Sequence, residues 1–298
     1  MTKETRATIC LFLTSLIWGI SFVAQVVSMD FMRPFTFNGV SILIGAVSLI
    51  PVILFFEREK IDAAEHKKVW IYGTILGLIL FAAANFQQFG VDHTGSAGKA
   101  GFITGLYIII VPIAGIFLKQ RASKFTWAGA GFAVAGMYFL TVQEAVGKPS
   151  IGDWLLFTGA FFWAAHIIAI DKFAPHVSPL RLSQAQFVVC GALCMVFAFL
   201  TETIDPALLL MAAVPLLYRG IGSIGVAYTL QIIGQRHVEP ARAAIIFSLE
   251  ALFSAVGAAI LLGETMGARG YTGCALIFAG ILVSQLPFGQ KNSRISAN

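Results

Sequence analysis

Two ionisable side chains lie inside long apolar stretches of the chain, Arg219 in residues 210–234 and Glu250 in residues 240–262. A charge is costly to place among lipid tails, so such a residue faces protein or water and is a functional candidate. If these stretches are antiparallel helices, Arg219 lies roughly 13 Å and Glu250 roughly 18 Å from their common end. We predict that the two charges pair in one state, while substrate or a proton competes for Glu250 in another. A permanent ion pair that only joins two helices is the alternative.

Two tryptophans and a histidine form a second group of candidates. Trp18 and Trp163 lie well inside apolar stretches, away from the membrane interfaces where tryptophan is usual. Because a buried indole N–H needs an acceptor, we predict that the pair forms aromatic walls of a cavity; ordinary helix packing is the alternative. His166 lies three residues after Trp163, on nearly the same helical face, and could carry a proton. A lone histidine is more often held by a structural hydrogen bond.

A shift of the sequence by 143 positions aligns further candidates in pairs, which are Gln88 with Gln231, Asn85 with Tyr228, and Tyr107 with Glu250. The two glutamines could satisfy backbone groups freed by helix distortion, or receive substrate at the mouths of a cavity. Asn85 and Tyr228 lie one helical turn deeper on the same faces, so we predict that they contact the substrate. We include Tyr107 because it is the partner of Glu250.

The composition predicts a membrane protein. Of the 298 residues, 58% are hydrophobic and only 12% are charged, and the mean hydropathy is +0.84. One globular core could not bury so much apolar surface. The net charge of +5 comes from basic residues in short loops, where membrane topology explains them, so we expect no nucleic-acid partner. The four cysteines lie in apolar stretches without neighbouring histidines, so we expect no metal site and no cofactor.

Crossing the hydrocarbon core takes about 20 helical residues. Ten stretches qualify, and they are residues 7–27, 36–56, 69–91, 97–118, 125–143, 152–170, 179–200, 210–234, 240–262 and 269–286. Pro112 and Pro215 fall inside the fourth and eighth stretches and should bend them, because each removes an intrahelical hydrogen bond. Most loop Lys and Arg residues lie on the side that holds both termini, which predicts a multi-pass protein with both termini in the cytoplasm.

The chain consists of two copies of one unit, residues 1–146 and residues 147–298, because the pattern of residues 97–140 recurs in residues 240–286. Five spans per copy is an odd number, so the second copy enters the membrane from the opposite face. Inverted repeats around a midplane site are a common construction of secondary transporters. We therefore predict an all-α integral membrane protein with ten transmembrane helices, arranged as two inverted five-helix repeats.

Four motifs resemble the EamA-type transporters of the drug/metabolite transporter superfamily. They are Leu13–Gly19, Ala97–Thr104, Ala227–Gln231, and Leu262–Glu264 followed by Gly273 and Gly280. The resemblance covers nearly the whole chain and implies ten helices, a central cavity lined by spans 1, 3, 4, 6, 8 and 9, and movement of small metabolites such as amino acids. The chain departs from the family in three places: it has Glu250-Ala251 where Glu-Pro is common, Ser41 where a basic residue is common, and the unusual Arg219.

Together these observations predict a secondary-active transporter of small polar metabolites, amino-acid-like or related, with alternating access around a midplane cavity. We expect a bacterial inner-membrane location, a small-molecule substrate, a coupling proton and no enzymatic activity. The alternatives are a passive channel and an intramembrane enzyme. The sequence contains neither a histidine pair at metal-ligand spacing nor a Gly-x-Ser-x-Gly elbow, which disfavours the enzyme.

Overall fold

The computed structural model describes residues 2–57, 61–95, 97–119, 122–141, 149–262, 267–284 and 286. The described residues are helical, with short turns and no strand. The helices are α1 (Lys3–Ser28), α2 (Pro34–Phe56), α3 (Ala63–Thr94), α4 (Ala97–Thr104), α5 (Tyr107–Phe117), α6 (Lys124–Thr141), α7 (Ile151–Phe173), the 3₁₀ turn η1 (Ala174–His176), α8 (Pro179–Thr201), α9 (Pro206–Met211), α10 (Ala213–Leu217), the π-helical segment η2 (Tyr218–Tyr228), α11 (Thr229–Gln235), α12 (Pro240–Phe247), α13 (Leu249–Leu262) and α14 (Ala268–Ser284).

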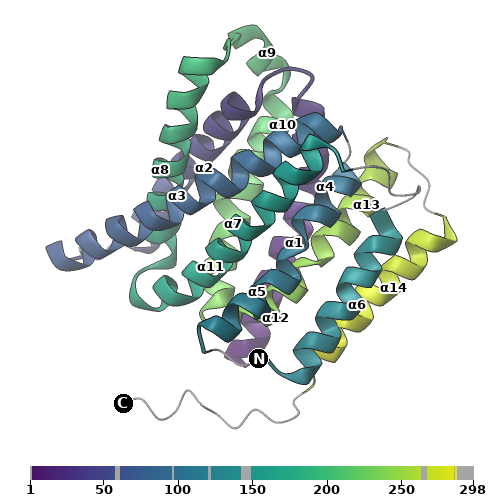
Figure 1. Ribbon diagram of the computed structural model, residues 1–298. Coiled ribbons are helices and arrows are strands. Elements are labelled where there is room, and N and C mark those ends of the chain that lie inside the picture. The colour runs from purple at the N-terminus through teal and green to yellow at the C-terminus, as the bar shows by residue number, and fades with distance from the viewer. Residues whose placement is uncertain are drawn as a thin grey trace.

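Eight of the ten predicted spans are confirmed as segments long and apolar enough to cross a membrane, counted over the described residues. These segments are Lys3–Ser28, Pro34–Phe56, Ala63–Thr94, Ala100–Phe117, Ile151–His176, Pro179–Thr201, Ala213–Gln235 and Pro240–Gly257. The other two predicted spans fall on α6, with 18 residues, and on α14, a shorter apolar helix of 17. The predicted boundary between the repeats, after residue 146, lies outside the described residues. Figure 1 shows α1 beginning and α14 ending at the same end of the bundle.

Three of the spans are interrupted in the middle. The fourth breaks between α4 and α5, where Leu106 N donates to the Ile103 carbonyl at 3.2 Å. The ninth breaks between α12 and α13 at Ser248, whose hydroxyl donates to the Ile245 carbonyl at 2.6 Å. These breaks are equivalent positions of the two repeats. The bend near Glu250 therefore forms without the proline that the family commonly has there.

The eighth span changes helix type instead of breaking. After Pro215 in α10 the chain continues as the wider π-helix η2, an unusually long stretch of this helix type. Pro215 thus coincides with a distortion, as expected. Pro112, in contrast, lies further along the continuous α5, and the interruption of the fourth span is at residues 105–106.

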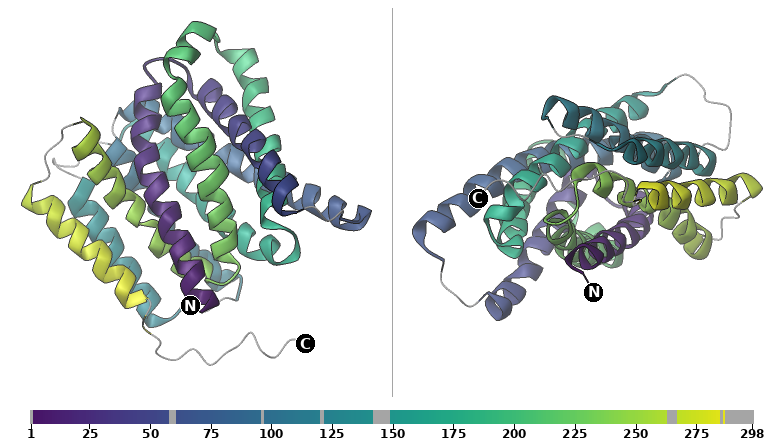
Figure 2. Two further views of the ribbon diagram at one scale, coloured as in Figure 1. Left: turned by 180° about the vertical axis from the view of Figure 1, so that it is seen from behind. Right: turned by 90° about the horizontal axis from the view of Figure 1, so that it is seen from below.

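Two pairs of equivalent helices hold the repeats together, and the first is α6 with α14. Figures 1 and 2 show these helices side by side at one edge of the bundle. A Cβ added to Gly129 would lie 2.6 Å from the Gly280 carbonyl, and one added to Gly136 would lie 2.6 Å from the Gly273 carbonyl. Only glycine allows this backbone approach, which is a common way to pack helices in lipid.

The second pair, α2 with α8, is held by a glutamate at each end. Glu202 follows α8 and accepts hydrogen bonds from Phe35 N at 2.9 Å and from Thr36 N and Oγ1 at 2.7 Å, at the start of α2. Its repeat equivalent, Glu57, follows α2 and accepts from Ser178 Oγ and from Arg181 Nε, the latter at 2.8 Å, at the start of α8. Each C-terminal glutamate therefore binds the start of the other helix. Glu202 caps free backbone N–H groups of α2, and Glu57 binds two side chains at the start of α8.

These contacts generate a first prediction. We expect Glu57→Gln and Glu202→Gln each to destabilise the protein by about 1.5–3 kcal/mol, because each weakens charge-assisted hydrogen bonds. The two sites lie at opposite ends of a helix of 23 residues, so the double variant should show the sum of the two losses. Thermal unfolding in detergent measures the effect. Asp30→Asn, in the exposed turn between α1 and α2, is the control and should keep the wild-type Tm. Single variants as stable as the wild type would contradict the role of these contacts.

Candidate functional site

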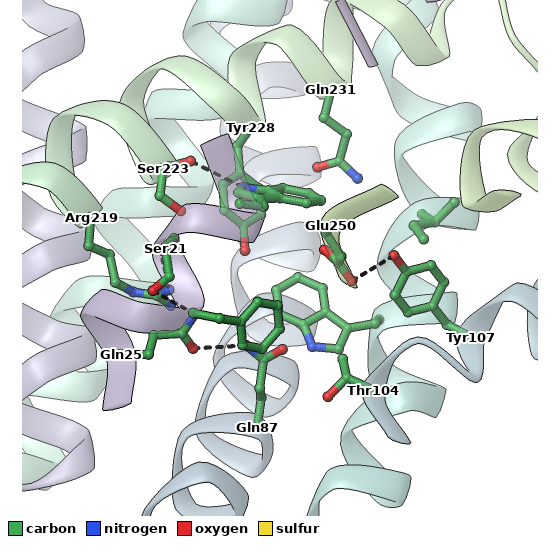
Figure 3. A pocket seen from close by; sticks show the side chains of 14 residues that line it. Ser21, Gln25, Gln87, Thr104, Tyr107, Arg219, Ser223, Tyr228, Gln231 and Glu250 are labelled. Carbon is green, nitrogen blue, oxygen red and sulfur yellow. Dashed lines mark hydrogen bonds between the residues drawn. The ribbon is translucent and has the colours of Figure 1, made fainter. Parts of the chain in front are cut away.

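A cavity of about 30 Å³ lies in the centre of the bundle, which in this conformation is room for about two water molecules. Its lining residues come from spans 1, 3, 4, 6, 8 and 9, the set that the family resemblance implies. They are Trp18, Ser21, Phe22, Gln25, Gln87, Thr104, Tyr107, Trp163, Ile167, Arg219, Ser223, Tyr228, Gln231 and Glu250. Figure 3 shows Arg219 and the Glu250–Tyr107 pair at opposite sides of this group.

Glu250 and Tyr107 form a hydrogen bond between equivalent positions of the two repeats. The Tyr107 hydroxyl donates to Glu250 Oε1 at 3.0 Å (Figure 3). Both residues lie in the first turn that follows a helix break, Tyr107 in α5 and Glu250 in α13. The break thus places the carboxylate near the N-terminus of α13, where the helix dipole stabilises a negative charge. Glu250 is 5% exposed, so this stabilisation acts in a poorly solvated place.

Arg219 projects from η2 and is 4% exposed. Its guanidinium donates to Ser21 Oγ and to Asn38 Oδ1, both at 3.4 Å, and lies 5.2 Å from the centre of the Phe37 ring. Its Nε has no hydrogen-bond partner among the described residues. These are neutral partners at long distances, so the positive charge is only weakly compensated.

Arg219 and Glu250 line the same cavity but do not form an ion pair with each other in the described structure. Each is held by neutral groups on other helices instead, Arg219 by α1 and α2 and Glu250 by α5. The predicted pairing in one state therefore stays a prediction, and the conformation described here is one in which the two charges are separate.

Trp18 and Trp163 meet at the cavity, with ring centres 6.4 Å apart. Trp18 Nε1 donates to the Ser223 carbonyl at 3.3 Å, and its ring lies 4.7 Å from that of Tyr228. The acceptor is a backbone carbonyl of the π-helix, as is the Ala227 carbonyl that accepts from Thr14 Oγ1 at 3.0 Å. η2 therefore serves both as a source of cavity side chains and as the surface that α1 binds.

Several buried polar groups of the cavity have no hydrogen-bond partner among the described residues. Both side-chain polar atoms of Gln231 are in this condition, although the residue is fully buried, and so are Thr104 Oγ1 and Trp163 Nε1. Figure 3 shows the Gln231 amide directed toward the group of cavity side chains. Leaving a buried polar group unsatisfied costs about 1–3 kcal/mol. These donors and acceptors are consequently available to a bound molecule or to water.

Three of the residues that the sequence suggested for the cavity do not line it. Asn85 accepts from Asn38 Nδ2 at 3.0 Å, and Asn38 in turn accepts from Arg219. Asn85 therefore holds the side chain that binds the arginine. The Gln88 amide donates to the Gln25 carbonyl at 3.4 Å. His166 is fully buried and bonded to Gln186 Oε1 at 2.8 Å. In this conformation all three make structural hydrogen bonds.

Five polar lining residues were not foreseen from the sequence, and they are Ser21, Gln25, Gln87, Thr104 and Ser223. Two of them share the helical face of Trp18 at spacings of three and seven residues, a pattern that could have identified them. Gln87 Nε2 donates to Gln25 Oε1 at 2.9 Å, which joins α3 to α1 at the cavity. Among the described residues, no group of three His, Cys, Asp or Glu side chains could hold a metal ion.

The chain matches the model of the EamA-like transporter family twice, over residues 5–142 and 150–286. An uncharacterized transporter of Archaeoglobus fulgidus is 29% identical over 288 residues, which are 95% of this chain and 87% of the relative. A probable amino-acid metabolite efflux pump of Salmonella typhimurium is 26% identical, and the match covers 95% of this chain and 96% of the relative. One solved crystal structure, 21% identical, superimposes with a TM-score of 0.78 over 94% of this chain and 96% of its own, which supports the fold alone.

Close packing of α1 on α13 beside Glu250 generates a second prediction. A Cβ on Gly19 would lie 2.5 Å from Phe253 Cβ and 2.7 Å from the Glu250 carbonyl. We expect Gly19→Ala to force the helices apart and to destabilise the protein by about 1–3 kcal/mol, seen as a lower Tm in detergent. Gly131→Ala is the matched control, because a Cβ there meets nothing within 4 Å and alanine favours the helix. Equal Tm values for the two variants would contradict the packing argument.

Proposed function

The chain belongs to the EamA-like transporter family, and from that premise we propose that it is a secondary-active transporter of small polar metabolites, amino-acid-like or related. It is a multi-pass membrane protein with two EamA repeats. The proposed mechanism is alternating access, in which the central cavity opens in turn to each side of the membrane. The proposed location is the plasma membrane of the bacterial inner-membrane type.

One observation carries this proposal, the Tyr107–Glu250 hydrogen bond at the edge of a polar cavity. The bond joins equivalent residues of the two repeats, so it lies at the contact between the units that must move relative to each other. Polar and charged groups inside a membrane span are expensive and usually mark a substrate pathway. The name of the Salmonella relative supports amino-acid-like metabolites as the substrate class.

Several finer points belong to the same proposal. Residues 1–146 and 147–298 are the two five-helix repeats, with α6 and α14 as their fifth spans and both termini in the cytoplasm. The proposed substrate-contacting residues are Trp18, Tyr107, Trp163, Tyr228, Gln231 and Glu250, which line the cavity, whereas Asn85, Gln88 and His166 lie outside its lining in the described conformation. The proposed coupling residues are Arg219 and Glu250. The close approach of α6 to α14 supports two equivalent outer helices, since each crosses the other at the same pair of glycines.

A proton supplies the coupling through Glu250. Substrate and proton compete for this carboxylate, so a carrier that has released its substrate can bind a proton before it returns. The hydrogen-bond partner of Glu250 supports this role because it is neutral: Tyr107 from α5 donates to the carboxylate. Gln231 from α11 lines the same cavity and has unused donors and acceptors. His166 in α7 is a second buried group that can titrate, and it is bonded to Gln186.

Substrate counterflow in proteoliposomes tests the transport mechanism. We expect vesicles loaded with unlabelled amino acid to accumulate the labelled amino acid transiently, because a carrier exchanges one molecule for another. A passive channel would equilibrate the label without accumulation, and an intramembrane enzyme would change its chemical identity. Vesicles without protein are the control. Absence of accumulation for amino acids and for related small metabolites would contradict a carrier.

The pH dependence of exchange tests the coupling. We expect wild-type exchange to fall as the pH is lowered, because a proton then occupies the Glu250 carboxylate. In Glu250→Gln, the exchange that remains should not change with pH. His93→Gln, at the exposed end of α3 and outside the cavity, is the control and should keep the wild-type pH profile. A normal profile in Glu250→Gln would rule out this carboxylate as the site of competition.

A further inference from the structure

We infer that the cavity, when it widens to admit a substrate, selects a small zwitterion, with the carboxylate of the substrate at Arg219 and its ammonium group at Glu250. This inference rests on the proposed function and adds to it the charge pattern of the substrate and the orientation in which it binds. It follows from an arrangement specific to this chain, a buried cation and a buried anion that line one cavity and are not paired with each other.

The anion subsite is built around Arg219. Ser21 and Asn38 hold the guanidinium from α1 and α2, and Asn38 is itself fixed because its amide donates to Asn85 Oδ1 at 3.0 Å and to the Ala84 carbonyl at 3.1 Å. The Arg219 Nε–H has no partner among the described residues. A carboxylate fits the fork of N–H donors of a guanidinium, and such charge-assisted bonds are the strong ones.

The cation subsite is built around Glu250. One carboxylate oxygen accepts the Tyr107 hydroxyl, and the other oxygen remains for a second donor. The unpartnered Gln231 side chain lines the same cavity (Figure 3). An ammonium group has three donors and no acceptor. Glu250, the Gln231 carbonyl oxygen and Thr104 Oγ1, another cavity group without a partner, offer the acceptors that it needs.

The cavity also has aromatic walls. Trp18 and Trp163 lie there, with Tyr228 6.2 Å from Trp163 and 4.7 Å from Trp18 between ring centres. Aromatic surfaces contribute packing and strengthen the fields of the charges at either end, because they exclude water. A ligand of two opposite charges therefore meets one complementary charge at each end.

Electrostatics explains why a singly charged molecule should bind weakly. A carboxylate alone compensates Arg219 but leaves the buried Glu250 without an opposite charge. An amine alone compensates Glu250 but leaves the buried Arg219 without an opposite charge. Leaving one member of a buried charge arrangement uncompensated typically costs about 2–5 kcal/mol. A zwitterion satisfies both charges and enters the membrane interior with no net charge. The cavity should therefore discriminate by the number and sign of charges before it discriminates by side chain.

Calorimetric titration of the purified full chain in detergent tests this inference with two sets of ligands of matched size. One set is L-alanine, propionate and ethylamine, and the other is L-phenylalanine, 3-phenylpropionate and 2-phenylethylamine. We expect the zwitterion to bind on the order of 30-fold more tightly than either singly charged analogue in at least one set. A singly charged analogue that binds as tightly as the zwitterion in both sets, or failure of both zwitterions to bind, would overturn the inference.

Two variants make the test independent of folding, because they should shift selectivity in opposite directions. Arg219→Gln should lose the preference for a carboxylate and bind the amine at least as well as the zwitterion. Glu250→Gln should do the reverse and favour the carboxylate. Arg33→Gln removes an exposed arginine outside the cavity, whose side chain is 64% exposed, and should keep the wild-type order. The same shift in both cavity variants, or no shift in either, would overturn the assignment of the two subsites.

The results separate this inference from the proposed function. Zwitterion binding without counterflow would support the subsites and contradict transport. Counterflow of an organic acid or an amine, with no preference for a zwitterion, would support transport and contradict the subsites.

Discussion

A helix inside a membrane can be interrupted only where other groups satisfy the backbone that the interruption frees. The candidate site of this protein depends on that constraint. At Ser248 the serine hydroxyl bonds to the Ile245 carbonyl, and in η2 the Ser223 and Ala227 carbonyls accept from Trp18 and Thr14 on α1. Because the backbone groups at these interruptions are hydrogen-bonded, Glu250 can lie at a helix N-terminus and Arg219 can project from a π-helix. Without them, both charges would project from uniform helices that offer neither feature.

The scaffold is more symmetric than the site that it encloses. The helix pairs α2/α8 and α6/α14 use residues at equivalent positions of the two repeats, the glutamates that end α2 and α8 and the facing glycines of α6 and α14, although Glu202 binds backbone N–H groups and Glu57 binds side chains. In the cavity the equivalents differ, because Glu250 corresponds to Tyr107 and Arg219 corresponds to Leu76. Both charges of the cavity thus belong to the second repeat. The paired outer helices preserve the architecture, and the differences at the centre give the cavity its polarity.

The sequence was informative where a single residue conflicts with its surroundings. Arg219 and Glu250 were identifiable as charges in apolar spans, and Trp18 and Trp163 as indoles far from the interfaces; all four line the cavity. The sequence was less informative where the outcome depends on helix rotation or type. Gln88 was chosen over Gln87, yet one residue turns a side chain by about 100°, and it is Gln87 that lines the cavity. Nothing in the periodicity indicated a π-helix, since two of its backbone carbonyls accept hydrogen bonds from α1, 205 and 213 residues away in the chain.

The exchange of glutamate contacts between α2 and α8 has a consequence for the origin of this architecture. Glu57 and the N–H groups at Phe35 and Thr36 belong to the same repeat but lie at opposite ends of one helix, so they can never bind each other within a single copy. Half of this chain, produced as a separate polypeptide, would contain both complementary ends and could join them only to those of an antiparallel sister molecule. In the fused chain the second repeat supplies this antiparallel partner. Fusion keeps these contacts and leaves each half free to diverge around the cavity.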